Sequence, residues 1–246
     1  MRLLLLSAAS LIVAQPAISQ DAGGWSGEGA FSASTSTGNT ETSQLGLGLN
    51  LNYKTGRWIY GVNASADYGE TDGTETQNRY LFGGKADVQL GDKLFGFGQG
   101  SYESDEFSGF ESRIFVGGGL GYHIFESETL KWNVRGGPGF KIDEVRPVMA
   151  NGMLVTPGET VESFSAIGNS DFAFNFNDNV GLTNVTTGLY AEESTQLTNT
   201  TALTATLTNA LSARMSFDVR HDTNPPMGFE STDTVTKASL VYNFNQ

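Results

Sequence analysis

The chain contains no cysteine among its 246 residues. A disulfide scaffold, a thiolate metal site and a cysteine nucleophile are therefore excluded. Basic residues are scarce as well, since 14 Lys and Arg face 27 Asp and Glu, and the formal net charge is −13. Phosphate binding needs a basic surface, so this charge argues against a nucleic-acid partner. With two histidines and no thiol, a zinc site is not expected either.

Long apolar runs are also missing beyond the N-terminus, so no transmembrane helix is predicted for the mature chain. Met1 and Arg2 precede the run LLLLSAASLIVA, which is too short to span a bilayer as a helix. Small residues at Ala17 and Ser19 suit cleavage by a signal peptidase. We therefore expect a signal peptide over residues 1–19 and an exported domain over residues 20–246, with an N-terminal anchor as the alternative.

The chain does contain many segments in which apolar and polar residues alternate. The stretch QLGLGLNLNY is an example, because Leu and Tyr at 45, 47, 49, 51 and 53 alternate with Gly and Asn. Segments of about ten alternating residues with aromatic residues at their ends are typical of transmembrane β-barrels. A soluble periplasmic β-sandwich that serves as a binding module is the alternative, since its strands also have one wet face. It does not explain why the polar side is so often Gly, Ser or Asn.

Twelve such segments can be counted, and weak signals over 94–102 and 180–190 leave ten as the alternative. Alternate connections are short, and the others are longer and polar, as outer-membrane barrels require of their periplasmic turns and external loops. The expected long loops are 35–43, 69–77, 103–111, 141–159, 191–199 and 221–233. We predict an all-β, antiparallel, up-and-down transmembrane β-barrel in the outer membrane, with outer-membrane lipids and lipopolysaccharide as its surroundings.

The last strand carries a further signal. Lys237, Ser239, Tyr242 and Phe244 follow a polar, small, aromatic, aromatic spacing that resembles the C-terminal insertion signal of bacterial outer-membrane barrels. Asn245 and Gln246 follow the final aromatic residue, whereas that signal often ends on it. The barrel-insertion machinery is therefore an expected partner.

Several stretches together resemble a known family. They are WSGEGAFSASTSTGNTET near the start of the mature chain, LGLNLNYKTGRW, SYESDEFSGFESRIFVGGGLGYHI and the closing SLVYNF. The chain is similar over essentially its whole mature length to the salt-induced, YdiY-like outer-membrane proteins, a domain of unknown function. The resemblance implies a Gram-negative outer-membrane barrel, and it supplies no reaction, substrate or functional residue.

Strand parity predicts which charged residues point into the barrel. The basic set exceeds the acidic set, which gives the interior a charge of about +3 if the registers hold. The candidate lumen-lining residues are Arg79, Lys85, Asp87, Arg113, Lys131, Arg135, Arg214, Asp218 and Arg220. Two interpretations stay open: the basic interior passes small anions, or the charges pair across the strands and plug a narrow barrel.

No residues are assigned to catalysis, a cofactor or a metal. The carboxylates at Glu103, Asp105 and Glu106 do not match a calcium loop, and we expect a solvated acidic loop there. A barrel lipid hydrolase would need a serine beside a histidine, and His221 is followed by Asp222 and Thr223 instead. We expect a structural protein or a narrow anion-preferring pore without enzymatic activity. A link to salt or envelope stress follows from the family name alone.

Overall fold

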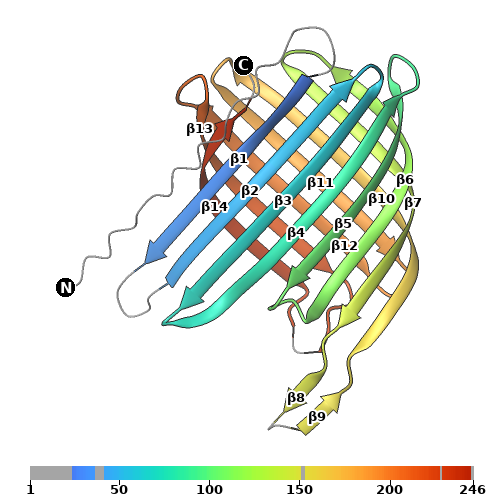
Figure 1. Cartoon of the computed structure of the whole chain (residues 1–246), viewed down its shortest axis with the longest axis vertical. Coiled ribbons are helices and arrows are strands. Elements are labelled where there is room, and N and C mark those ends of the chain that lie inside the picture. Colours follow the sequence, from blue (N-terminus) through green and yellow to red (C-terminus); the bar gives the residue numbers. More distant parts are fainter. Residues whose placement is uncertain (1–23, 37–41, 151–152, 228, 245–246) are drawn as a thin grey trace, which may run out of the picture.

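The computed structural model describes residues 24–36, 42–150, 153–227 and 229–244. Twelve of its strands close into an antiparallel barrel in which neighbours along the chain are neighbours in the wall, and β1 pairs with β14 (Figure 1). The twelve-stranded prediction is confirmed, and the ten-stranded and sandwich alternatives are wrong for the described chain. No helix in the described residues is long and apolar enough to span a membrane. The predicted signal peptide lies outside the described residues.

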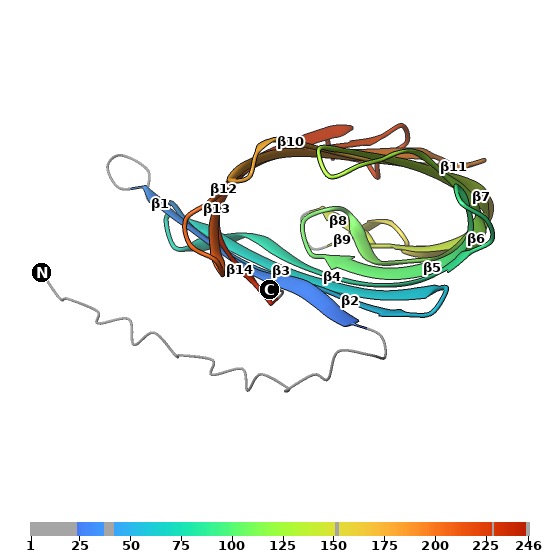
Figure 2. The same cartoon turned by 90° about the horizontal axis from the view of Figure 1, so that it is seen from above.

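The barrel strands contain 12 to 19 residues each. They are β1 (Gly24–Ser36), β2 (Thr42–Thr55), β3 (Trp58–Thr71), β4 (Thr74–Gln89), β5 (Leu94–Asp105), β6 (Phe110–Glu126), β7 (Leu130–Val145), β10 (Glu159–Asn177), β11 (Val180–Ala191), β12 (Thr195–Thr206), β13 (Leu211–Asp222) and β14 (Thr232–Asn243). Two short strands, β8 (Val148–Ala150) and β9 (Met153–Thr156), form a separate hairpin between β7 and β10. Seen from above, the barrel has an oval outline (Figure 2).

The two ends of the barrel differ in their connections. One end, here called the turn end, carries β1's first residue, β14's last residue and the short connections between β2 and β3, β4 and β5, β6 and β7, β10 and β11, and β12 and β13. The opposite end, here called the loop end, carries the β8–β9 hairpin and the nine-residue connection between β13 and β14 over 223–231. Both terminal strands therefore begin or end at the turn end.

Two of the predicted long loops are short connections of two and three residues. β3 and β4 are joined only by Asp72 and Gly73, which both have positive φ angles, of 50° and 74°. Positive φ at both central residues is the geometry of a type I′ hairpin, for which Asp-Gly is a preferred sequence. The connection predicted over 191–199 likewise shortens to residues 192–194. The strands at these positions extend beyond the ends that the sequence pattern predicted.

Aromatic side chains gather at both ends of the outward face. Near the turn end, Trp25 lies 4.9 Å from Tyr53, and Tyr242 lies 5.5 Å from Phe244, in each case between ring centroids. Tyrosines 68, 80, 102 and 190 are exposed near the loop end. This arrangement is that of the two aromatic girdles of an outer-membrane barrel.

The strand with ambiguous parity, β5, turns aromatic residues inward. Phe95 and Phe97 are buried inside the barrel, where they form a cluster with three other apolar side chains from β6, β10 and β11. This apolar cluster consists of Phe95, Phe97, Phe115, Ile167 and Leu189. The inward face of the neighbouring strand β6 is rich in glycine because the rings need the room: a Cβ added at Gly121, which pairs with Phe95, would meet the Phe95 ring. The middle of the barrel is therefore packed on one side.

Candidate functional site

The half of the interior nearer the loop end is filled by ion pairs. Arg79 on β4 lies 2.7 Å from a carboxylate oxygen of Glu103 and 3.8 Å from one of Asp67. Arg220 on β13 approaches Glu103 and Asp105 on β5 to 3.7 and 3.8 Å. Five strands separate β5 from β13 in either direction around the wall, so these contacts cross the barrel.

A second set of contacts tightens the same half. Arg113 on β6 and Asp222 on β13 form an ion pair of 2.9 Å, with four strands between them. Lys141 is only 2% exposed, and its Nζ lies 2.7 Å from Asp143 and 3.1 Å from the hydroxyl of Ser194. Because a buried charge is stable only with a partner, the Arg113–Asp222 pair holds β6 to β13. Lys141 and Asp143 both lie on β7, and it is the hydrogen bond to Ser194 that links this strand to the β11–β12 turn.

The connection between β13 and β14 reaches the opposite rim. A Cβ added at Gly109, in the turn between β5 and β6, would meet the Phe229 ring and Pro226. Gly109 has a φ of 76°, and its carbonyl accepts a hydrogen bond of 3.0 Å from the amide of Arg146. The loops of three hairpins thus meet over the loop end, above the ion pairs.

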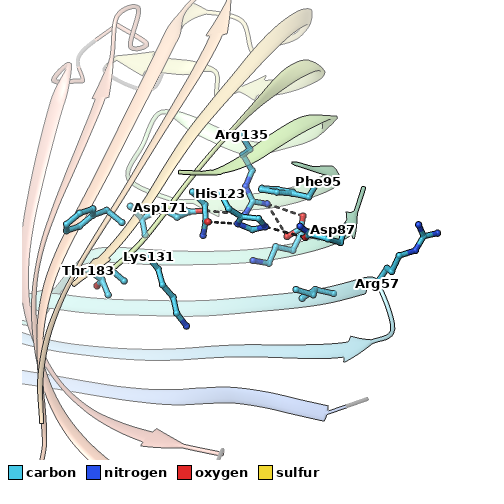
Figure 3. Close-up of a pocket in the computed structure, with 15 residues that line it drawn as sticks. Arg57, Asp87, Phe95, His123, Lys131, Arg135, Asp171 and Thr183 are labelled. Atoms are coloured by element: carbon cyan, nitrogen blue, oxygen red, sulfur yellow. Dashed lines mark hydrogen bonds and ion pairs between the residues drawn. The ribbon is translucent and has the colours of Figure 1, made fainter. Parts of the chain in front are cut away.

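The half nearer the turn end contains a cavity of about 430 Å³. Figure 3 shows that side chains from several strands converge on it. Its charged lining consists of the cations Arg57, Lys85, Lys131 and Arg135 and the carboxylates Asp87 and Asp171, with His123 beside them. Its apolar wall includes Ile59, Phe95, Ala173 and Val185. The charged lining carries an excess of positive charge, because the cations outnumber the carboxylates.

Arg135 is the fixed centre of this cavity. Its guanidinium lies between two carboxylates, 3.1 Å from Asp87 and 3.2 Å from Asp171 (Figure 3). It also faces the rings of Phe95 and Phe97, at 5.3 and 5.5 Å from their centroids, which is a cation–π geometry. Arg135 is therefore held on two sides and its charge is already matched.

The remaining cations of the cavity are unmatched. Within the described part of the chain, no ion pair or side-chain hydrogen bond involves Lys85, Lys131 or Arg57. His123 is different, since its ring nitrogens lie 2.6 Å from Asn133 and 3.3 Å from Gln89. Two lysines can thus donate hydrogen bonds to a ligand inside the cavity, and the arginine stands at its mouth in the β2–β3 turn.

The distribution of charge differs from the one that parity predicted. Glu103, Asp105, Asp143 and Asp222 were expected in loops, but they point into the barrel, as does one further cation, Lys141. These residues cancel the predicted excess of about +3 for the interior as a whole. The positive charge that is left is local to the cavity near the turn end.

The other candidate residues occupy separate places. Arg214 forms an ion pair of 2.7 Å with Glu28, and Asp218 accepts a hydrogen bond of 2.6 Å from Thr200. In the predicted insertion signal, Lys237 points inward to Asp67 at 2.6 Å, and Ser239 lies on the same face of β14. Tyr242 and Phe244 point outward, and residues 245–246 lie outside the described chain.

In the part of the chain that the structure describes, the side-chain hydrogen bonds of the two histidines go to Asn133, Gln89 and Thr232 and not to a serine. Among the described residues, no group of three or more His, Cys, Asp or Glu could hold a metal ion. The expectation of a solvated acidic loop at Glu103, Asp105 and Glu106 was wrong for the first two, which pair with arginines inside the barrel. His221 contacts the hydroxyl of Thr232 at 2.8 Å, while Asp222 turns inward to Arg113.

Two solved structures share this fold with the chain at low sequence identity. The COG4313 outer membrane channel from Pseudomonas putida F1 superposes with a TM-score of 0.53, at 9% identity, over 92% of this chain and 97% of the channel. The translocator domain of the autotransporter NalP from Neisseria meningitidis gives 0.51, also at 9% identity, over 93% and 90% of the two chains. At such identity the likeness shows the fold alone, which is that of an outer-membrane barrel.

Sequence similarity supports the resemblance to the YdiY-like proteins that the quoted stretches of sequence indicated. The uncharacterized protein YdiY from Escherichia coli K12 is 24% identical over 190 residues, which cover 77% of this chain and 70% of that protein. Residues 29–244 match the family described as protein of unknown function, DUF481. The match spans all twelve barrel strands except the first residues of β1, and the chain belongs to this DUF481 family.

Proposed function

We propose that this protein is an outer-membrane barrel with a narrow path for small anions, closed near the loop end in the conformation described here. The observation that carries the proposal is the excess of cations in the cavity, above all the unmatched Lys85 and Lys131. Rings of charged side chains select ions of opposite sign in other pores. The paired charges elsewhere in the barrel confer no such preference.

The orientation of the path follows from the connections. Short turns face the periplasm in outer-membrane barrels, and longer loops face outward. The basic cavity therefore opens toward the periplasm, and the ion pairs and crossing loops lie on the external side. Tyr242 and Phe244 point outward at the periplasmic end, as the proposed insertion signal requires, and lipid and lipopolysaccharide surround the wall.

Opening the path requires the contacts that cross the barrel to separate. The pair between Arg113 and Asp222 is one such contact, and Phe229 against Gly109 is another. A barrel in which they never separate would be a purely structural envelope protein. That is the second candidate function, and the filled external half of the interior favours it.

Conductance of the folded, purified protein in a planar bilayer decides between these functions. In a salt gradient we expect discrete steps with a reversal potential that shows anion preference. Lys85→Glu and Lys131→Glu should each weaken or reverse that preference. Lys93→Glu is the matched control, because Lys93 also lies at the turn end but faces the Tyr122 ring and does not line the cavity.

Opening can be tested separately from selectivity. The double variant Arg113→Gln/Asp222→Asn removes both charges of the crossing pair, and we expect more frequent open steps. Silence from folded wild type and from this double variant would favour the structural protein. Cation preference in the wild type, or equal effects of the cavity and control lysines, would contradict the proposed pore.

A further inference from the structure

We infer that the cavity near the turn end is a binding site for a small organic anion, a carboxylate or phosphate ester with an apolar body. This deepens the proposed function, on which it rests for the orientation of the cavity toward the periplasm. A path for inorganic ions alone needs only charge and water. The cavity has a second property, an apolar wall, that such ions cannot use.

The charged side of the cavity is arranged for an anion. Lys85 comes from β4 and Lys131 from β7, so their ammonium groups enter the cavity from different strands. Asp87 and Asp171 would repel an anion, but both are bonded to Arg135. A hydrogen bond from an unmatched ammonium to an anion is stronger than one between neutral groups. The site therefore offers two free, charged donors beside a group in which Arg135 offsets one of the two carboxylate charges, and the lining as a whole stays positive.

The apolar side is built from other strands. Ile59 on β3, Ala173 on β10 and Val185 on β11 line the cavity together with the Phe95 ring. Phe95 is kept in place by the His123 ring at 4.7 Å between centroids and by the glycine face of β6. Small-molecule sites are mostly apolar with a few placed polar groups, and they have volumes of about 300–1,000 Å³. The 430 Å³ cavity fits this description.

The cavity also has a floor. Phe95 belongs both to its lining and to the buried apolar cluster with Phe97, Phe115, Ile167 and Leu189. A ligand that enters from the turn end therefore meets packed side chains before it reaches the ion pairs of the other half. Such a recess favours residence of a molecule over free passage.

Isothermal titration calorimetry on the folded barrel in detergent micelles tests this inference. The probes are phenyl phosphate, phenylacetate, inorganic phosphate and the neutral benzyl alcohol, each also titrated into empty micelles. We expect saturable binding of one or both aromatic anions, weaker binding of inorganic phosphate and none of benzyl alcohol. The tighter of phenyl phosphate and phenylacetate identifies the anionic group that the site prefers.

Variants assign the binding to the two sides of the cavity. Lys85→Gln and Lys131→Gln should each weaken binding about tenfold, since each removes a charged hydrogen bond, while the control Lys93→Gln leaves it unchanged. Ile59→Ser/Val185→Ser should reduce the advantage of phenyl phosphate over inorganic phosphate. Resistance of each barrel to unfolding in SDS without heating shows that it is folded. Equal affinity of the Lys93 and cavity variants would overturn the assignment.

The site and the pore can fail separately. Saturable binding by a protein that never conducts would support the site and contradict the pore. Anion-selective conductance that depends on Lys85 and Lys131, without saturable heat for any anion, would support the pore and overturn the site.

Discussion

Replacing Arg135 with methionine should destabilise the barrel more than any other loss of a single cation in the cavity. The guanidinium side chain is 8% exposed and bonds to two carboxylates at 3.1 and 3.2 Å. Methionine keeps much of the side-chain length and the contact with Phe95, but it leaves Asp87 and Asp171 without a counter-charge. The loss of stability therefore comes from two carboxylates left without an ion-pair partner and not from a cavity left by the substitution.

The size of the effect follows from the burial of the partners. Removing one member of a buried ion pair costs about 3–5 kcal/mol, because the other member stays buried and charged. Asp87 is 13% exposed and incurs most of this cost, whereas Asp171 is 33% exposed and is partly screened by water. We expect Arg135→Met to lower the free energy of unfolding by about 3 kcal/mol.

Urea unfolding of the refolded barrel in detergent, followed by tryptophan fluorescence, measures this difference. The triple variant Arg135→Met/Asp87→Asn/Asp171→Asn should recover more than half of the lost free energy of unfolding, since it leaves no unpaired charge at this place. Arg57→Met is the control, because Arg57 has no carboxylate partner in the described chain, and its effect should stay within about 0.5 kcal/mol. A loss below about 1 kcal/mol for Arg135→Met, or no recovery in the triple variant, would refute the reasoning.

Two further variants test the packing inside the barrel and the contact between its loops. Gly121→Ala should lower the free energy of unfolding in urea by about 1–3 kcal/mol, because the new methyl group meets the Phe95 ring. Gly188→Ala is the control: a Cβ at Gly188 has nothing within 4 Å, and the free energy of unfolding should change by less than about 0.5 kcal/mol. Equal costs would show that the ring does not occupy that place. Phe229→Ala should raise the frequency of open conductance steps, since it removes the ring that rests on Gly109; an unchanged frequency would show that this contact does not hold the path closed.

The outward face of the barrel is what the sequence predicted best. Leu45, Leu47 and Leu49 alternate with small and polar residues, and all three leucines are exposed on the outside. Alternation of this kind is a local property, so each strand could be recognised without knowledge of its neighbours. The number of strands follows from the same signal, whereas closure of the sheet is shown by the pairing of β1 with β14.

The lengths of the strands were less predictable, for a physical reason. At the loop end, β5 continues to Asp105 and β13 to Asp222, although acidic residues there resemble a solvated loop. Their carboxylates are satisfied by arginines on distant strands, and Arg113 and Asp222 are 109 residues apart in the sequence. A single strand's pattern contains no information on such a partner. The Asp72-Gly73 turn is the exception, because that dipeptide alone could have revealed the tight hairpin.

The orientation of β5 shows the same limit in the core. Its alternate residues are Phe95 and Phe97 on one face and Gly96 and Gly98 on the other. An aromatic residue suits either a lipid-facing wall or a packed interior, so the alternation alone could not decide whether Phe95 and Phe97 point outward or inward. The choice is made by β6, whose inward glycine at 121 leaves space for a ring. Only the pairing of the two strands brings these facts together.

The weak signal over β11 has a different origin, a polar cluster on the outside of the wall. Val185 lines the cavity, so its neighbours Asn184 and Thr186 point outward, where they face Thr201 and Asn199 of β12. Each asparagine side chain donates hydrogen bonds to the other asparagine and to one threonine, at 2.7 to 3.3 Å, and each threonine hydroxyl donates to an asparagine oxygen at 3.2 Å. Every side-chain N–H and O–H of the cluster is thus satisfied internally, which removes most of the cost of placing it in an apolar surrounding. A polar outward face and an apolar inward face are therefore both compatible with a barrel strand once the contacts of its neighbours are counted.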